Sequence, residues 1–431
     1  MFRTLPLRSS IRMVECPRDA MQGLPHFIPT EQKIRYLKAL LKCGFYALDC
    51  GSFVSPRAVP QMRDSTEVIA NCWKTMQEEK AAPKLSVVVA SLAGFKQALE
   101  TPGVSVIGYP IGCCERFQQR NAKKSIAMSL DEIRNIKEAT DAFNAQRSSN
   151  PVAPNEDVNG RELLIYISMA FGNPYGESHS IDLVEKLVGE LVASGARDIS
   201  LADTTGVAQP PLIFDTFTQL RKKFPDVTFA GHFHSNAVEA RGKIVAALDA
   251  GCTMIDSALC GMGGCPFAKD DGLVGNVATE VVVKALEERG VLPAALNKEQ
   301  LKKCVLIKQE IFGVSVRDML ISQTLHDEKR FATLCQEHFK LYDVNDDGTL
   351  DYEGFRDSMI HVFAELGAPQ PSEEKIRSSF AKVDIQNLGF ITTDAYTMGA
   401  RRLLVKRLAS NTNTTTKNEE RGEGVVEASS C

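Results

Sequence analysis

The segment Ile199–His234 reads ISLADTTGVAQPPLIFDTFTQLRKKFPDVTFAGHFH and contains the two patterns that decide the fold. Ile199–Asp203 and Thr228–Phe233 are short runs rich in apolar and β-branched residues, as is typical of buried strands. Between them, Pro210–Phe224 starts with prolines and repeats apolar residues at helical spacing. The segment therefore predicts a strand–helix–strand unit with parallel strands.

The same alternation continues on both sides of this segment and predicts the complete architecture. Eight strand–helix units over about 250 residues are what a (β/α)8 barrel requires. A doubly wound open sheet also alternates strands and helices, but no glycine-rich dinucleotide turn follows the first strand here. We therefore predict an α/β chain with a TIM barrel. The other strands are expected at Ile11–Glu15, Tyr46–Cys50, Leu85–Ser91, Val104–Tyr109, Leu163–Ser168 and Thr253–Ser257, with helices at Glu31–Lys42, Ser178–Ser194 and Val238–Ala250.

Composition shifts along the chain predict four parts. Residues 1–10 form an N-terminal arm or a short targeting segment, because they carry arginine and serine but no acid. Residues 11–325 form the barrel domain, with a polar surface loop at 146–160. A small all-α domain follows at 327–409, and the polar residues 410–431 are expected to be a disordered tail. The arm suggests a mitochondrial location, with the cytoplasm as the alternative.

The overall composition excludes several classes of protein. The 431 residues are 44% hydrophobic and 24% charged, which excludes a wholly disordered or fibrous chain. With 50 basic and 54 acidic side chains, the net charge of −4 argues against nucleic acid as a partner. No apolar run is long enough to cross a membrane. The 12 cysteines lack CxxC spacing, so we expect free thiols in a reducing compartment.

Polar side chains follow the predicted strands at their carboxyl ends, where barrel enzymes place catalytic groups. His232 and His234 lie on one side of the seventh strand, because side chains alternate along a strand. Two imidazoles with carboxylate and amide oxygens would suit Mg²⁺, Mn²⁺ or a similar divalent ion. The alternative is that these histidines face solvent or make core hydrogen bonds. The other strand-end residues are Arg18, Asp19, Asp49, Ser52, Asp203, Thr204, Cys265 and Asn276.

Two of these residues also have simpler interpretations. Arg18 and Asp19 could form a plain ion pair, although a strand-end arginine is also suited to holding a carboxylate or a developing enolate oxygen. Cys265 lies among glycines and a proline, in a loop that could close over a site, but it could equally be a structural thiol.

Five segments, in this order along the chain, resemble the 3-hydroxy-3-methylglutaryl-CoA lyase family. This family belongs to the metal-dependent barrel lyases and synthases with an Arg-Asp or Asp-Arg-Glu opening motif. The resemblance covers about residues 11–325 and implies an enzyme that cleaves the acyl-CoA to acetyl-CoA and acetoacetate by a retro-Claisen reaction, as a homodimer. The segments are VECPRDAMQG (14–23), GSFVSPRAVPQM (51–62), ISLADTTGVAQP (199–210), GHFH (231–234) and GMGGCPFAKDDGLVGNVATE (261–280).

The resemblance also implies a role for each matching residue. Arg18 would stabilise the enolate-like oxygen, and Cys265 would take part in proton transfer. The general base is left open between His232 and a carboxylate such as Asp203, and Asp49 would support the site. The resemblance implies Asp19, His232, His234 and Asn276 as ligands of Mg²⁺ or Mn²⁺, and Arg18, Gln22, Ser52, Ser200 and Thr204 as contacts of the acyl-CoA substrate; Glu115, Phe117 and Asn121 match a further family pattern.

The chain departs from the family pattern near the acyl-CoA. Asp49 stands where many members carry Glu, and Gly23-Leu24-Pro25 replaces an Asn-Glu-Lys run with a CoA-contacting lysine. The loop between Cys265 and Asn276 is longer. These differences leave the metal ligands intact. They keep two alternatives open: a related barrel lyase or aldolase acting on another hydroxyacyl-CoA or hydroxy acid, and a non-catalytic calcium-responsive scaffold.

The stretch 339–355, FKLYDVNDDGTLDYEGF, resembles the EF-hand helix–loop–helix motif. Its calcium ligands would be Asp343, Asn345, Asp347, Thr349 and Asp351, but Gly354 replaces the bidentate glutamate at position twelve. A second loop at 384–395 lacks several ligands, and Leu350 and Ile391 are expected to pair the two loops. The region is either a degenerate EF-hand pair kept for packing or a weak Ca²⁺ site that modulates the barrel.

Overall fold

The computed structural model describes residues 11–24, 26–79, 83–149, 160–235, 237–263, 275–312, 325, 328–365, 370–384 and 387–419. The chain divides into two compact units, Met1–Phe312 and Gly313–Cys431. This division differs from the boundary expected at 325, and Leu325 is buried in a cluster with residues of the second unit. The predicted N-terminal arm and Cys265 lie outside the described residues.

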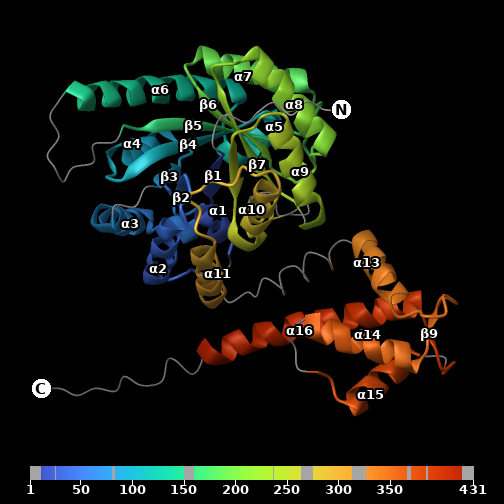
Figure 1. Ribbon diagram of the computed structural model, residues 1–431. Coiled ribbons are helices and arrows are strands. Elements are labelled where there is room, and N and C mark those ends of the chain that lie inside the picture. Colours follow the sequence, from blue (N-terminus) through green and yellow to red (C-terminus); the bar gives the residue numbers. More distant parts are fainter. Residues whose placement is uncertain are drawn as a thin grey trace, which may run out of the picture. The chain divides into compact units, whose positions relative to one another are not determined.

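The first unit contains a closed barrel of eight parallel strands that pair in chain order, β1 to β8 (Figure 1). Each predicted strand is present, so the TIM-barrel prediction is confirmed. The ring closes where Val14 of β1 pairs with Asp256 of β8. The strands are β1 (Arg12–Glu15), β2 (Ala47–Ser52), β3 (Lys84–Val88), β4 (Val104–Gly112), β5 (Glu162–Ser168), β6 (Asp198–Asp203), β7 (Thr228–Phe233) and β8 (Met254–Ser257).

Helices alternate with these strands and surround the barrel (Figure 1). Ser180 caps the N-terminus of α7 by accepting a hydrogen bond from the Leu183 amide. The loop predicted from residue 146 begins later, because α6 continues to Ser149, with the Ser149 hydroxyl bonded to the Ala145 carbonyl. The helices are α1 (Pro17–Gln22), α2 (Thr30–Leu40), α3 (Ser65–Glu79), α4 (Leu92–Glu100), α5 (Glu115–Ala122), α6 (Ile126–Ser149), α7 (Ile181–Ala193), α8 (Pro210–Lys223), α9 (Ala237–Asp249), α10 (Thr279–Glu288) and α11 (Lys298–Phe312), with short 3-10 turns η1 (Leu41–Cys43), η2 (Pro60–Met62) and η3 (Leu259–Gly261).

Side chains from alternate strand positions form a buried cluster in the barrel. Because alternate residues of a strand face the same side, each strand contributes inward residues in layers. The cluster comprises Val14, Cys16, Ala47, Val106, Leu164, Tyr166, Ala230 and Met254.

The second unit consists of two helix–loop–helix segments joined by a short antiparallel sheet. β9 (Thr349–Leu350) pairs with β10 (Ile391–Thr392), and Leu350 stands opposite Ile391 as predicted. The helices are α13 (Glu328–Lys340), α14 (Tyr352–Glu365), α15 (Glu373–Val383) and α16 (Thr393–Glu419).

The start of the predicted tail differs from the expectation. α16 extends to Glu419, so residues 410–419 are helical rather than without secondary structure. Adding residues to an existing helix costs much less than nucleating one, and this allows a polar segment to continue it. Within the described ranges, no helix has the length and apolar character needed to cross a membrane.

Candidate metal centre

Asp19, His232 and His234 meet at the carboxyl end of the barrel. Their ligand atoms all lie within 4.8 Å of one another. Asp19 comes from α1, which directly follows β1, whereas the histidines come from the end of β7. The Nε2 atoms of His232 and His234 are 3.2 Å apart. Residues more than 200 positions apart in the sequence thus converge on one point, as the sequence predicts.

Asn276 joins this group from the segment after β8. It forms an isolated antiparallel bridge with His234. Its side-chain Nδ2 donates to Asp19 Oδ2 at 2.6 Å and to the Met262 carbonyl at 2.9 Å. All four residues predicted as metal ligands are therefore in one cluster, which we call the ligand cluster.

The ligand cluster fits a divalent cation. Metal–nitrogen bonds of about 2.1 Å place two adjacent ligands of an octahedral or tetrahedral ion about 3 to 3.5 Å apart. The separation of 3.2 Å between the histidine Nε2 atoms agrees with this spacing. Asp19 and His234 are buried, with 6% and 3% of their surface exposed. Imidazole with carboxylate is a donor set that suits Mn²⁺, Zn²⁺ or Mg²⁺.

Arg18 lies beside the ligand cluster and is held by two carboxylates. Its Nε and Nη2 bind Asp49 Oδ2 at 2.9 and 2.6 Å, and its Nη1 contacts Asp19 Oδ1 at 3.1 Å. Gln22 accepts a further bond from Nη1 at 2.9 Å and donates to Asp19 Oδ1 at 2.6 Å. Burial opposes the charge of Arg18, but Asp49 and Asp19 outweigh it and raise the pKa of the guanidinium. Arg18 is thus a fixed positive charge.

The two carboxylates differ in their proton affinity. Burial raises the pKa of Asp49 to about 6, although Arg18 opposes this shift. Burial acts the same way on Asp19, but Arg18, His232 and His234 outweigh it and lower the pKa of Asp19. Asp19 is therefore ionised, as a metal ligand must be.

Asp256 is a site residue that the sequence analysis missed. It stands opposite His232 in the β7–β8 register, and its Oδ2 lies 3.0 Å from His232 Nδ1. Burial alone would lower the pKa of His232, but the hydrogen bond and charge of Asp256 raise it. Cys16 completes a second close group with these two residues. The signal that could have found Asp256 is its charge directly after the apolar residues Met254 and Ile255 in the short strand β8.

Asp203 lies at the end of β6 but is engaged elsewhere. Its Oδ2 forms a buried ion pair with Lys243 Nζ at 2.7 Å, and its Oδ1 accepts from the Ala208 amide at 3.1 Å. Both oxygens are thus used in structural bonds. Lys243 carries no signal in the sequence, because a lysine within a helix normally faces solvent.

The predicted substrate contacts fall into two groups. Ser52 Oγ donates to the Val88 carbonyl at 2.9 Å, and Thr204 Oγ1 accepts from the Met169 amide at 2.9 Å, so these hydroxyls stabilise strand ends. Ser200 Oγ on β6 is buried and has no hydrogen-bond partner in the part of the chain that the structure describes. Glu115, Phe117 and Asn121 lie on α5, where Asn121 bonds to the Phe117 carbonyl.

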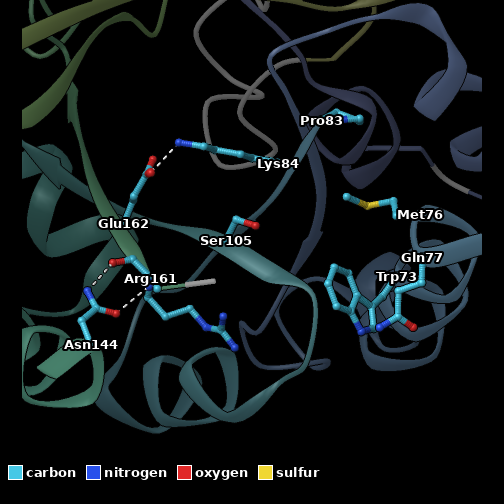
Figure 2. Close-up of a pocket in the computed structure, with 10 residues that line it drawn as sticks. Trp73, Met76, Gln77, Pro83, Lys84, Ser105, Asn144, Arg161 and Glu162 are labelled. Atoms are coloured by element: carbon cyan, nitrogen blue, oxygen red, sulfur yellow. Dashed lines mark hydrogen bonds and ion pairs between the residues drawn. The ribbon is translucent and has the colours of Figure 1, made fainter. Parts of the chain in front are cut away.

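A cavity of about 580 Å³ lies at the opposite end of the barrel. Lys84 and Glu162, the first residues of β3 and β5, line it and form an ion pair. Figure 2 shows Trp73 across the cavity from Arg161, whose main chain is bonded to Asn144. Because it lies at the amino ends of the strands, this cavity is separate from the ligand cluster.

Comparison with known proteins agrees with the fold. A family described as HMGL-like matches residues 12–307. The mitochondrial hydroxymethylglutaryl-CoA lyase of Mus musculus is 32% identical over 291 residues, covering 67% of this chain and 81% of the relative. The 3-hydroxy-3-isohexenylglutaryl-CoA/hydroxy-methylglutaryl-CoA lyase of Pseudomonas aeruginosa is 33% identical over 281 residues, covering 65% and 86%.

Solved structures give the same result. An HMG-CoA lyase from Acinetobacter baumannii, in complex with coenzyme A and 3-methylmalate, matches with a TM-score of 0.59 and 26% identity. The match covers 70% of this chain and 92% of that one. The similarity therefore extends over the barrel and nearly the full length of the solved protein.

Proposed function

The chain belongs to the HMGL-like family and is a lyase, and on this premise we propose that it cleaves 3-hydroxy-3-methylglutaryl-CoA to acetyl-CoA and acetoacetate with a divalent metal. The observation that carries the proposal is the convergence of Asp19, His232 and His234 beside the fixed charge of Arg18. We propose Mg²⁺ or Mn²⁺ as the ion, held by these three residues and Asn276. When bound, such an ion supplies Lewis-acid polarisation of substrate oxygens.

The reaction requires a positive charge where the carbon–carbon bond breaks. The tertiary hydroxyl loses its proton, the bond cleaves to leave a ketone, and its electron pair passes to the thioester as an enolate. That enolate then takes up a proton at carbon. Arg18 suits the stabilisation of the enolate oxygen, because Asp49 and Asp19 fix its position before substrate binds. Cys265 remains the proposed proton donor, although it lies outside the described residues.

Neither candidate base has a free proton-accepting atom in a metal-bound site. His232 Nε2 faces the ligand cluster while its Nδ1 is held by Asp256. Asp203 has both oxygens engaged, by Lys243 and the Ala208 amide. We therefore propose His232 as a ligand of the ion and Asp203 as a supporting residue, with neither as the proton acceptor of the metal-bound enzyme.

The acyl group of the substrate can vary within this family of enzymes. The Pseudomonas aeruginosa relative carries the name of a longer, isohexenyl substrate as well as the methyl one. Gln22, fixed beside Arg18, and the Ser200 hydroxyl, which has no partner among the described residues, are the polar groups that we propose for the acyl group. The rival proposal is a related lyase or aldolase acting on another hydroxyacyl-CoA or hydroxy acid.

One assay separates these alternatives. The purified chain, stripped of metal, is given Mg²⁺ or Mn²⁺ and a panel of hydroxyacyl-CoA thioesters, and ketone release is measured. Metal-dependent acetoacetate release from 3-hydroxy-3-methylglutaryl-CoA supports the proposal. Preference for another thioester supports the related lyase, and no turnover of any member would leave the non-catalytic scaffold.

For the second unit, we infer a helix–loop–helix pair whose main role is packing. Leu350 and Ile391 are buried in a core shared by its helices. The Asp343 carboxylate already accepts bonds from the Asp347 and Gly348 amides, and Asp347 accepts from Thr349. Weak Ca²⁺ binding by Asp343, Asn345, Asp347, Thr349 and Asp351 is the alternative. Heat of Ca²⁺ binding to the full chain, lost in Asp343→Ala, would support that alternative.

We also propose an acyl-CoA as the small-molecule partner, a homodimer as the assembly and the mitochondrion as the compartment. Named relatives include mitochondrial and bacterial enzymes, so the cytoplasm stays as the alternative location. Light scattering of the purified chain tests the dimer, and cell fractionation tests the location.

A further inference from the structure

Lys243 is a buried lysine in a helix of the outer ring. It lies on α9, with its side chain on the face that also buries Ala240, Ile244 and Ala247, and none of its surface is exposed. Burying an ammonium group costs several kcal/mol unless its charge and protons are compensated. An apolar residue would fill this position without that cost. A buried lysine here therefore points to a specific role for its ammonium group.

All three protons of the Lys243 ammonium have partners. Nζ donates to Asp203 Oδ2 at 2.7 Å, to the Gly206 carbonyl at 2.8 Å and to the His234 carbonyl at 2.9 Å. The side chain therefore joins the end of β6, the turn that follows it and the residue after β7. Asp203 and Gly206 belong to one turn, whereas His234 follows the next strand. His234 is also a residue of the ligand cluster.

The backbone of His234 needs such an anchor. The β7–β8 ladder ends at the pair His232–Asp256, so His234 lies beyond the regular strand pairing. On one side it is held by its bridge to Asn276. On the other side, its carbonyl accepts from Lys243, which is in turn fixed by Asp203. The His234 backbone is therefore linked directly to this ion pair.

We propose that Lys243 is a positioning residue of the metal centre, which holds His234 in register with His232 through the buried pair with Asp203. The inference rests on the proposed metal-dependent function, because it assumes that His234 ligates the ion. Removing such outer-shell support typically weakens metal binding 10- to 100-fold. Lys243 itself contacts neither substrate nor ion.

The test measures Mn²⁺ affinity without substrate, by the electron paramagnetic resonance signal of free Mn²⁺. Lys243→Met should weaken Mn²⁺ binding about 10- to 100-fold. Asp203→Asn combined with Lys243→Met removes the unpaired carboxylate, so the double variant should regain thermal stability yet bind Mn²⁺ as weakly as the single variant. Lys243→Arg, which keeps the charge and several donors, should recover part of the affinity.

Lys33→Met is the matched control. Lys33 is also buried in a helix and paired with a carboxylate, Asp64, at 2.8 Å, but it contacts no residue of the ligand cluster. This variant should lose stability and keep wild-type Mn²⁺ affinity. Wild-type affinity in folded Lys243→Met or in the double variant, or equal weakening in Lys33→Met, would overturn the proposal.

The same measurement separates this inference from the proposed function. A wild-type chain that binds no Mn²⁺ would overturn both the metal-dependent function and the role of Lys243. A wild-type chain that binds Mn²⁺ but does not cleave 3-hydroxy-3-methylglutaryl-CoA would overturn only the proposed substrate. In that case the affinities of the variants still decide the role of Lys243.

Discussion

Asp256 and His232 face each other across the β7–β8 register, with Oδ2 of the carboxylate 3.0 Å from Nδ1 of the imidazole. This contact turns the other ring nitrogen, Nε2, toward His234 and fixes the tautomer that a metal ligand needs. A carboxylate behind a metal-binding imidazole also raises its basicity.

Asp256→Asn should weaken Mn²⁺ binding about 10- to 100-fold and lower the pKa of His232 in the metal-free protein. The pKa falls because the hydrogen bond and charge of Asp256 now hold it up against burial. Titration calorimetry and NMR of the histidine ring measure the two effects. Asp198→Asn, at the amino end of β6, is the control and should change neither. An unchanged His232 pKa in Asp256→Asn would contradict the prediction.

Arg18→Lys tests whether turnover requires the planar, multiply bonded guanidinium of Arg18 or only a positive charge at this position. Lysine keeps the charge but cannot bind Asp49 through two nitrogens while also reaching Asp19 and Gln22. We expect kcat to fall about 10²- to 10³-fold, with Mn²⁺ affinity changed less than about tenfold. The exposed Arg241→Lys is the control. Equal losses of turnover and Mn²⁺ affinity would instead place Arg18 in metal binding.

Glu15 predicts a pH dependence of stability. Burial raises its pKa to about 8 in the folded protein, against bonds from Thr279 Oγ1 and the Leu259 amide that lower it. Between its ordinary value of 4.5 and about 8, the folded protein holds a proton that the unfolded chain releases. The free energy of unfolding therefore falls as pH rises through this window.

Glu15→Gln should remove that dependence, because the amide is neutral and keeps both hydrogen-bond partners. We expect the variant to be more stable than the wild type by on the order of 4 kcal/mol at pH 8 and nearly equal at pH 4.5. Urea unfolding at the two pH values measures this difference. Glu138→Gln, an exposed substitution on α6, is the control. Its free energy of unfolding should change with pH in the same way as that of the wild type. If the difference in the free energy of unfolding between Glu15→Gln and the wild type is the same at both pH values, the raised pKa of Glu15 is refuted.

The barrel could be predicted from sequence because its signal is local. Each strand is a short buried run, so β-branched and apolar residues mark it without reference to other strands. Once the strands are predicted, their carboxyl ends can be located. Asp19, Arg18 and the two histidines are then recognised as residues at those ends. His-x-His was informative because two residues on the same side of a strand must point in one direction.

Other site residues depend on pairing that the sequence does not display. Asp256 acquires its role only because the β7–β8 register places it opposite His232. Lys243 matters because α9 packs it against the end of β6, which neutralises Asp203. The division after Phe312 likewise has no local signal, since the burial of Leu325 depends on the core that it joins. Each of these facts concerns contacts between distant segments.

Gly263 gives a test of how tightly the ligand cluster is packed. Its φ of +110° is a conformation that L side chains rarely adopt. A Cβ there would lie 2.4 Å from Asn276 Nδ2 and 3.0 Å from Asp19 Oδ2, closer than van der Waals contact allows. Gly263→Ala should therefore push Asp19 and Asn276 apart.

We expect Gly263→Ala to weaken Mn²⁺ binding at least about tenfold and to cost about 1–3 kcal/mol of stability. Gly290→Ala separates the two causes, because Gly290 also has a positive φ, +66°, but no atom lies within 4 Å of its added Cβ. That variant should lose stability through backbone strain alone and keep its Mn²⁺ affinity. If both variants bind Mn²⁺ equally well, Asp19 and Asn276 tolerate separation, and the ion does not depend on their contact.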